Sequence, residues 1–263
     1  MSPQYEVYAI KYAHHARRAS ENFIGGDPHD GPMPLDYFVW LIRGAGREIV
    51  VDTGFSAAMA AKRGREHIRC PAEALRLLQC DAAAVKDVVI THLHYDHVGN
   101  FDLFPAATLH LQDLEMRYAT GRHMGEERHR YAYEVEEVVG MVRRTYENRV
   151  RFHDGDAELA PGVSLHLIGG HTMGLQAVRV ATRRGWVVLA SDASHFYANI
   201  EQVRPFPIVW SVADMVEGYG RLRELAGSPE HIIPGHDPLV LERYSAPSRE
   251  TGRPLGGIVA RLD

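Results

Sequence analysis

The sequence has few of the features that mark extracellular, membrane-spanning or nucleic-acid-binding proteins. Its two cysteines, Cys70 and Cys80, are too few for a disulfide framework, so we expect a reducing compartment. No apolar run approaches the roughly 18 residues of a membrane span, and the first residues lack a basic segment followed by an apolar one. With 29 basic against 34 acidic residues, the chain lacks the excess of cations on which nucleic-acid binding depends. We therefore expect a cytoplasmic protein whose partners include neither a membrane nor a nucleic acid.

Length and composition favour one large α/β domain, which we predict to span residues 1–263. The chain has 263 residues, of which 45% are hydrophobic, and this is enough for a sizeable core. Its 16 histidines exceed ordinary usage. Histidine is the commonest metal ligand, so the excess points to metal binding if the histidines gather in one place.

The apolar pattern predicts a mixture of strands and helices. Helices are expected near 56–66, from Pro71, over 113–119 and 134–146, and from an N-cap at Ser211 to Gly227. Strands are expected over 5–12, 35–42, 48–51, 85–90, 108–111, 149–153, 163–168, 175–182, 186–190 and 231–233. Residues 13–34 are rich in glycine and proline, which predicts a long loop that covers a substrate site. We expect this loop and the segment 117–133 to determine specificity.

A dense group of candidate metal ligands follows the predicted strand 85–90. The segment 92–97 reads His-Leu-His-Tyr-Asp-His, with three imidazoles and one carboxylate in six positions. His92 and His94 are two residues apart in extended backbone, so they point the same way and can hold one ion. Asp96 and His97 are adjacent and must point elsewhere, which favours a second ion close by.

Three further candidates each lie in a tight turn after a predicted strand. They are His171 in Gly-Gly-His-Thr-Met-Gly, Asp192 in Ala-Ser-Asp-Ala-Ser and His236 in Pro-Gly-His-Asp. Strand-end loops are where α/β scaffolds place their chemistry, and glycine allows the backbone to approach a centre closely. If Asp192 bridges, each ion has three terminal ligands and a shared carboxylate. This ligand count fits a site for two metal ions.

The ordered set of motifs resembles the metallo-β-lactamase-fold hydrolase superfamily over roughly residues 35–240, with Asp52-Thr53-Gly54 as the first motif. The resemblance implies an αββα sandwich, in which two mixed sheets pack face to face, helices lie outside and metals lie at one edge. It implies that one metal is held by His92, His94 and His171, the other by Asp96, His97 and His236, and that Asp192 bridges. It also implies a structural role for Asp52.

Within the superfamily the chain is most similar to the N-acyl-homoserine-lactone lactonases. Those enzymes carry a tyrosine three residues after the bridging aspartate, where it hydrogen-bonds the substrate carbonyl. Here that position is His195, and Tyr197 follows two residues later, so either side chain is the candidate donor. The apolar residues of the 13–34 loop (Phe23, Ile24 and Met33) favour an apolar or ring-bearing lactone and would suit a homodimer contact.

The resemblance thus predicts a dinuclear hydrolase that opens a lactone ring by attack of metal-bound hydroxide, with two Zn²⁺ ions as the default and quorum quenching as the associated role. Asp96 would pass the water proton to the leaving alkoxide, and a small-molecule lactone would be the partner. Four arginines, at positions 143, 144, 149 and 151, are interpreted first as a solvated face and second as contacts for an anionic substrate.

Two enzyme classes of the same fold remain as alternatives, and a non-catalytic metal sensor is a third. Glyoxalase-II-like thioesterases share every ligand but add a C-terminal helical region, and only about 25 residues follow His236. Mononuclear iron sulfur dioxygenases use two histidines and the bridging aspartate. Metal stoichiometry therefore separates the dioxygenases from a dinuclear hydrolase.

Overall fold

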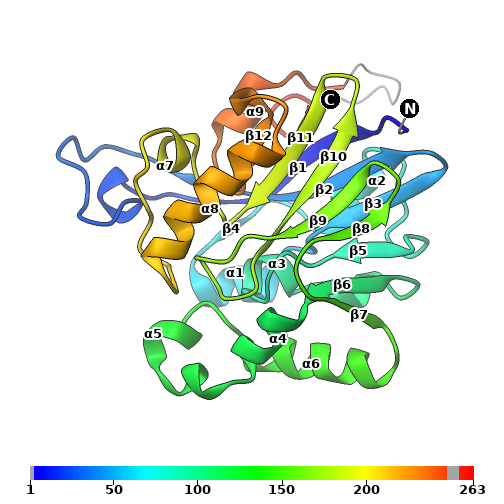
Figure 1. The fold of residues 1–263 in the computed structure, drawn as a ribbon, viewed down its shortest axis with the longest axis horizontal. Coiled ribbons are helices and arrows are strands. Elements are labelled where there is room, and N and C mark those ends of the chain that lie inside the picture. The colour runs from blue at the N-terminus through cyan, green and yellow to red at the C-terminus, as the bar shows by residue number, and fades with distance from the viewer. Residues whose placement is uncertain (1–2, 248–254) are drawn as a thin grey trace.

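The computed structural model describes residues 3–247 and 255–263, and its strands form two sheets (Figure 1). The larger sheet has the order β13-β1-β2-β3-β5-β6-β7, with β4 paired to β1. Its strands are β1 (Glu6–His15), β2 (Leu35–Gly44), β3 (Arg47–Val51), β4 (Glu66–His67), β5 (Asp87–Val89), β6 (Thr108–Gln112), β7 (Val150–His153) and β13 (Val259–Arg261). The smaller sheet, in the order β12-β11-β10-β9-β8, contains β8 (Ala157–Ala160), β9 (Val163–Leu167), β10 (Gln176–Thr182), β11 (Gly185–Ser191) and β12 (Ile232–Pro234).

Alternation along the strands builds one apolar layer between the sheets and one on each outer face. In β2, Phe38 and Trp40 belong to the layer between the sheets, whereas Tyr37 and Val39 belong to the outer layer of the larger sheet. In the smaller sheet, successive residues of β11 alternate in the same way between the middle layer and the other outer layer. Both sheets therefore need a cover of helices.

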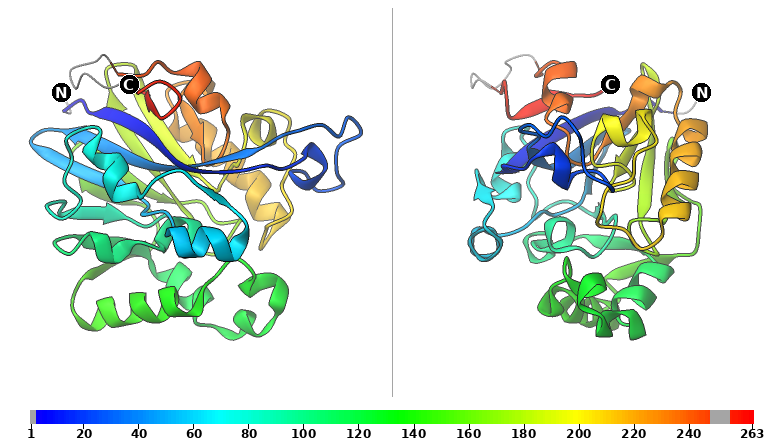
Figure 2. Two further views of the ribbon diagram at one scale, coloured as in Figure 1. Left: turned by 180° about the vertical axis from the view of Figure 1, so that it is seen from behind. Right: turned by 90° about the vertical axis from the view of Figure 1, so that its left-hand side faces the viewer.

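The helices supply that cover. They are α1 (Ala57–Arg63), α2 (Pro71–Arg76), α3 (Tyr95–Val98), α4 (Asp113–Ala119), α5 (Glu127–Arg130), α6 (Val135–Tyr146), α7 (Tyr197–Glu201), α8 (Val212–Leu225) and α9 (Leu239–Arg243). Leu75 of α2 and Met141 of α6 pack in the outer layer of the larger sheet, and Tyr219 and Leu222 of α8 pack on the smaller sheet. Figure 2 shows the two sheets between these helices from two further sides. The arrangement confirms the predicted αββα sandwich.

The strand directions bring the chemistry-bearing loops together. β3, β5 and β6 run parallel in one sheet, and β11 and β12 run parallel in the other. The residues that follow β3, β5, β11 and β12 meet at one edge of the sandwich. Asp52 and Ser191 at this edge have positive φ angles of 60° and 47°, a conformation that costs energy outside glycine. Such strain is typical of functional sites.

Most predicted elements are confirmed. The helix predicted over 113–119, for example, is α4 with the same bounds. Two differences come from long-range pairing. Residues 13–15 continue β1 instead of opening the predicted loop, because His15 pairs with Leu35 of β2 and Ala13 with His67 of β4. The short strands β4, β8 and β13 were not predicted, since their pairing partners create them and no local pattern does. In the part of the chain described here, no helix is long and apolar enough to span a membrane.

Candidate metal centre

Groups of buried His and Asp side chains that could hold a metal ion meet at this edge of the sandwich. The first group is His92, His94 and His171, and the second is Asp96, His97, Asp192 and His236. A third set, His171, Asp192 and His195, overlaps both of them. The larger sheet supplies four of these residues through the loop after β5 and through α3, whereas the smaller sheet supplies His171, Asp192 and His236. The structure thus brings together all seven side chains predicted as metal ligands.

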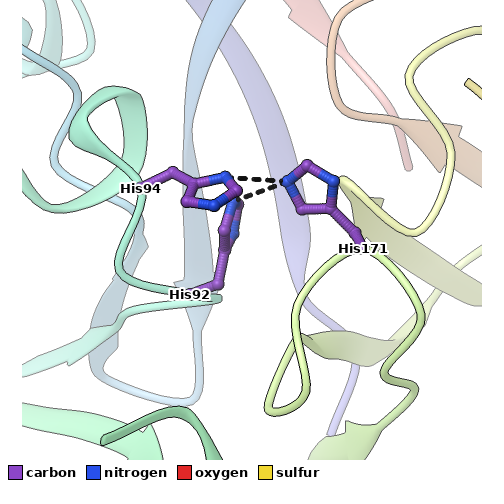
Figure 3. A group of neighbouring side chains, drawn as sticks. All are labelled: His92, His94 and His171. Atoms are coloured by element: carbon purple, nitrogen blue, oxygen red, sulfur yellow. Dashed lines mark hydrogen bonds between the residues drawn. The ribbon is translucent and has the colours of Figure 1, made fainter. Parts of the chain in front are cut away.

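In the first group, three ring nitrogens converge on one point (Figure 3). His171 Nε2 lies 3.2 Å from His92 Nε2 and 2.9 Å from His94 Nδ1. His94 therefore presents a different ring nitrogen from its two neighbours. Figure 3 shows His171 facing the other two rings from the opposite side of the group.

In the second group, the carboxylate of Asp192 is the common partner. Its Oδ1 lies 3.0 Å from His236 Nε2 and 3.3 Å from His97 Nε2. Its Oδ2 turns to the first group and lies 3.3 Å from His171 Nε2. Asp96 Oδ2 lies 3.7 Å from His97 Nε2. The two oxygens of Asp192 are thus divided between the groups, which is the arrangement that a bridging carboxylate requires.

The outward-facing ring nitrogens are held by oxygen acceptors. His97 Nδ1 donates to Asp52 Oδ2 at 2.7 Å, His171 Nδ1 to the Ile208 carbonyl at 2.7 Å and His236 Nδ1 to the Asp36 carbonyl at 2.9 Å. When each ring is neutral, a proton on Nδ1 leaves the lone pair on Nε2, which points at the centre. Such outer hydrogen bonds orient metal-binding histidines and increase their basicity. Asp52 is in turn fixed by the backbone N–H of Thr91 at 2.8 Å.

Burial and mutual contact determine the protonation of the cluster. Burial lowers the pKa of His92, His94 and His171, so these rings are neutral near pH 7 and can accept a metal ion. For His97, burial also acts to lower the pKa, but the carboxylates of Asp192, Asp52 and Asp96 outweigh it and raise the pKa. Burial would raise the pKa of Asp192, yet the surrounding histidines hold it well below its usual range.

Hydrogen bonds within the cluster leave some of its buried polar atoms without a partner, and divalent ions would satisfy these atoms. His97 Nε2 and Asp192 Oδ1 are buried and make no hydrogen bond to any residue that the structure describes. Leaving such atoms without a partner costs about 1–3 kcal/mol each. A cation among nitrogen and carboxylate donors would satisfy both atoms. The residues therefore form a His/Asp cluster suited to divalent metal ions.

The structure separates the two candidate substrate donors. His195 lines the cavity beside the cluster, stacks on Phe206 at a centroid distance of 3.5 Å and lies 3.0 Å from Asp192 Oδ2 through Nε2. Burial lowers its pKa to about 3, so the ring is neutral. Tyr197 instead packs in the layer between the sheets, with the Arg243 guanidinium 3.8 Å from its ring, and does not line the cavity. The first turn of α7 carries Tyr197 away from the cavity, so of the two candidate donors only His195 lies beside the cluster.

Glu115 is a part of the site that sequence reasoning missed. This buried carboxylate of α4 accepts hydrogen bonds from the Leu93 backbone at 2.9 Å, from Thr172 Oγ1 at 2.6 Å and from the Tyr133 hydroxyl at 2.8 Å. It thereby ties the loop that holds His92 to the loop that holds His171. An acidic residue in the first turn of a helix is common, so the sequence contained no distinguishing signal.

Three apolar residues of the loop after β1 lie away from the cavity, although Arg17 of the same segment lines it. Phe23 is buried under the Arg204 guanidinium, 3.8 Å from the ring centroid, and Met33 packs against the outer layer of the larger sheet. Neither residue lines the cavity, nor does Ile24. Phe23 and Met33 anchor the loop and Ile24 is exposed. None of the three is positioned to contact a substrate at the cluster.

Comparison with known proteins agrees with this geometry. The model of the Metallo-beta-lactamase superfamily matches residues 33–245. A probable metallo-hydrolase of Mycobacterium tuberculosis is 27% identical over 224 residues, which cover 73% of this chain and 68% of that protein. An N-acyl homoserine lactonase of Bacillus thuringiensis is 30% identical over 152 residues, 57% of this chain and 55% of that protein.

Solved structures share the fold at lower identity. The crystal structure of a quorum-quenching N-acyl homoserine lactone lactonase has a TM-score of 0.74 at 23% identity, over 90% of this chain and 93% of that one. An N-acyl homoserine lactone hydrolase with N-hexanoyl-L-homoserine at its catalytic metal centre has a TM-score of 0.74 at 22% identity, over 90% and 94% of the two chains. Since the family model covers most of the sequence and every member of both ligand groups, the chain belongs to the Metallo-beta-lactamase superfamily, as a metallo-hydrolase with a buried His/Asp cluster.

Proposed function

We propose that the protein is a dinuclear metal-dependent hydrolase that opens lactone rings. The division of the two Asp192 oxygens between the ligand groups, at 3.0 Å from His236 and 3.3 Å from His171, carries the proposal. It favours two ions over the single iron of a dioxygenase. Similarity to homoserine lactonases supports a lactone as the substrate.

The proposed ligand sets are His92, His94 and His171 for one ion and Asp96, His97 and His236 for the other, with Asp192 shared. Zinc suits this mixture of imidazole and carboxylate donors. Ions held there would lower the pKa of a water molecule towards neutrality and polarise a carbonyl group.

The protein's own contribution lies in proton transfer and orientation. Asp96 lines the cavity, and its Oδ2 faces His97 and His236 at 3.7 and 3.8 Å, so it is placed to carry a proton to the leaving oxygen. His195 is the remaining candidate donor to the substrate carbonyl. A neutral imidazole has one ring proton, and in the structure that proton has Asp192 as its acceptor. His195 must therefore exchange this partner for the substrate, or serve by holding Asp192.

A hydrolysis panel of lactones, thioesters and β-lactams with the metal-loaded protein tests the proposal, together with metal content by mass spectrometry. We expect lactone turnover with close to two zinc ions per chain, and a lower metal count in His97→Ala. His29→Ala, a change of an exposed loop histidine, is the matched control and should keep both ions. Preference for thioesters would favour the glyoxalase-II-like alternative, and full activity with one iron would favour the dioxygenase.

Three further properties, the natural substrate, the location and the oligomeric state, can be tested separately. Acyl-homoserine lactones are the first substrates to test, and their hydrolysis would make the protein quorum quenching. The free thiols of Cys70 and Cys80 agree with the expected cytoplasmic location. Sedimentation of the purified protein tests the expected homodimer.

A further inference from the structure

Two arginine side chains share the cavity with the metal ligands. The cavity of about 40 Å³ is lined by Arg17 and Arg65, by the rings of Tyr37 and Tyr95, and by members of both ligand groups including Asp96. Arg17 follows β1, and Arg65 lies between α1 and β4. Segments far apart in the sequence thus place two arginine residues in the lining of one cavity.

Arg65 is held by uncharged partners. Its NH1 donates to the Arg63 carbonyl at 2.6 Å and lies 3.2 Å from His15 Nε2, and its Nε donates to the Tyr95 hydroxyl at 3.2 Å. Burial and the neighbouring guanidinium groups lower the pKa of His15 to about 4, so this ring is neutral. Among residues 3–247 and 255–263, no carboxylate lies within 4.0 Å of the Arg65 guanidinium.

The partners of partly buried arginines differ along the chain. Arg149 and Arg179 also lack a carboxylate among the described residues and donate to backbone carbonyls, but neither lines the cavity. Arg63 forms an ion pair with Glu134 at 2.7 Å, and Arg43 forms one with Glu48 at 2.6 Å. Arg17, whose side chain is only 14% exposed, has Glu21 at 3.8 Å, and that carboxylate is itself half exposed. A partly desolvated guanidinium that lines the cavity and has no close carboxylate is suited to an anionic group of a ligand.

A chain of contacts through two tyrosines links Arg65 to the second ligand group. The Tyr95 hydroxyl that accepts its hydrogen bond lies 3.4 Å from the Tyr37 hydroxyl, and the Tyr37 ring packs edge-on against His236 at a centroid distance of 5.0 Å. One aromatic layer thus separates the guanidinium from the second ligand group. The acids that line the cavity, Asp96 and Asp192, face the histidines of that group.

We propose that Arg65, assisted by Arg17, binds a carboxylate group of the substrate, so that the preferred lactone is anionic. This inference rests on the proposed lactonase function and adds the substrate class. It replaces the apolar substrate expected from Phe23, Ile24 and Met33, which lie outside the cavity. The arginines considered from the sequence lie elsewhere, and Arg149 donates to the backbone carbonyl of Ala107 at 2.6 Å.

The kinetic test compares a γ-lactone that carries a carboxylate with its uncharged methyl ester, using variants with verified metal content. In Arg65→Gln we expect kcat/KM for the carboxylated lactone to fall about 10- to 100-fold, mainly through KM, because a charge-assisted hydrogen bond is lost. The ester should change less than threefold. Arg65→Lys should restore part of the loss. Arg47→Gln, at an exposed arginine outside this cavity, is the matched control.

Equal losses for both substrates, or no loss for either, would overturn the inference. Arg17→Gln is a second variant that tests the same cavity in case Arg65→Gln fails to fold, and it should also impair only the anionic substrate. Calorimetric titration with glutarate adds a readout that does not depend on turnover. Binding should weaken at least about fivefold in Arg65→Gln, and equal binding contradicts the proposal. If the wild-type protein opens neither lactone but binds glutarate through Arg65, the lactonase function fails while the anion site stands.

Discussion

At the scale of single residues, the site depends on hydrogen bonds that hold each candidate metal-binding side chain in one orientation. Asp52 shows this best, since one carboxylate oxygen holds His97 Nδ1 at 2.7 Å and the other accepts the Thr91 N–H at 2.8 Å. Its positive φ of 60° is a conformation that asparagine also tolerates. Asp52 therefore acts on the metal ligands without contacting the centre itself.

Asp52→Asn should weaken metal binding while preserving the fold. The amide keeps the size and the backbone conformation of the aspartate but removes the negative charge beside His97. Loss of such an outer partner lowers metal affinity by roughly 10- to 100-fold. Competition with a fluorescent zinc chelator measures the affinity, and circular dichroism checks the fold. Unchanged affinity would show that the Asp52–His97 contact has no part in holding the ion.

Asp96→Asn should lower kcat for the best lactone by roughly 10²-fold, within the range for groups that transfer protons. Asparagine keeps the side-chain size but cannot carry the proton to the leaving oxygen. Stopped-flow turnover at matched metal content measures the effect. An unaltered kcat with a full metal complement would contradict the proposed role of Asp96.

At the scale of secondary-structure elements, α6 holds a carboxylate in an unfavourable place. Glu137 has a buried side-chain oxygen, Oε2, that makes no hydrogen bond to the residues described here. Burial, together with the charges of Glu134 and Asp96, raises the pKa of Glu137 to about 8. The folded protein thus binds this proton more tightly than the unfolded chain, where a glutamate has a pKa of about 4.3.

This difference gives the stability of α6 a defined pH dependence. The favourable contribution is complete below about pH 4 and is lost as the pH rises to about 8, because ionised Glu137 is penalised only in the folded state. Glu137→Gln should remove this slope and raise the free energy of unfolding at pH 8 by roughly 2 kcal/mol or more. Urea unfolding from about pH 5 to 8 measures it, with the exposed neighbour variant Glu136→Gln as control. Parallel curves for wild type and Glu137→Gln would refute the argument.

At the scale of the whole molecule, the ligand groups join the two sheets. His92 and His94 follow a strand of the larger sheet, whereas His171 and Asp192 come from the smaller one. An ion held between them links both halves of the sandwich and stabilises the folded state by mass action. Glu115 adds a second link between the same loops.

Removal of metal should therefore lower the stability of the entire domain. Treatment with EDTA should reduce the unfolding temperature by roughly 10 °C, as expected when a tightly bound ligand is lost from a protein of this size. Differential scanning calorimetry measures the shift. His97→Ala should show a smaller response to EDTA, and His29→Ala the full response. Identical unfolding temperatures with and without EDTA would mean that no ion couples the sheets.

The sequence by itself indicated the seven candidate metal ligands and the fold class. His92, His94, Asp96 and His97 are close along the chain, and their spacing after an apolar strand already separates two directions of coordination. His171, Asp192 and His236 each stand in a short motif with glycine nearby. The αββα fold followed from resemblance and from alternating apolar patterns, because periodicity is a local property that the chain displays directly.

Only the tertiary structure decided what surrounds the ligands. Whether His195 or Tyr197 reaches the cavity depends on where the first turn of α7 begins, which the sequence does not mark. Arg17, Arg65 and Glu115 are separated from the ligands by many residues, and their closeness arises from strand pairing and helix packing. Contacts between distant segments depend on the whole fold. For that reason the members of the His/Asp cluster could be predicted, whereas the side chains proposed to select the substrate could not.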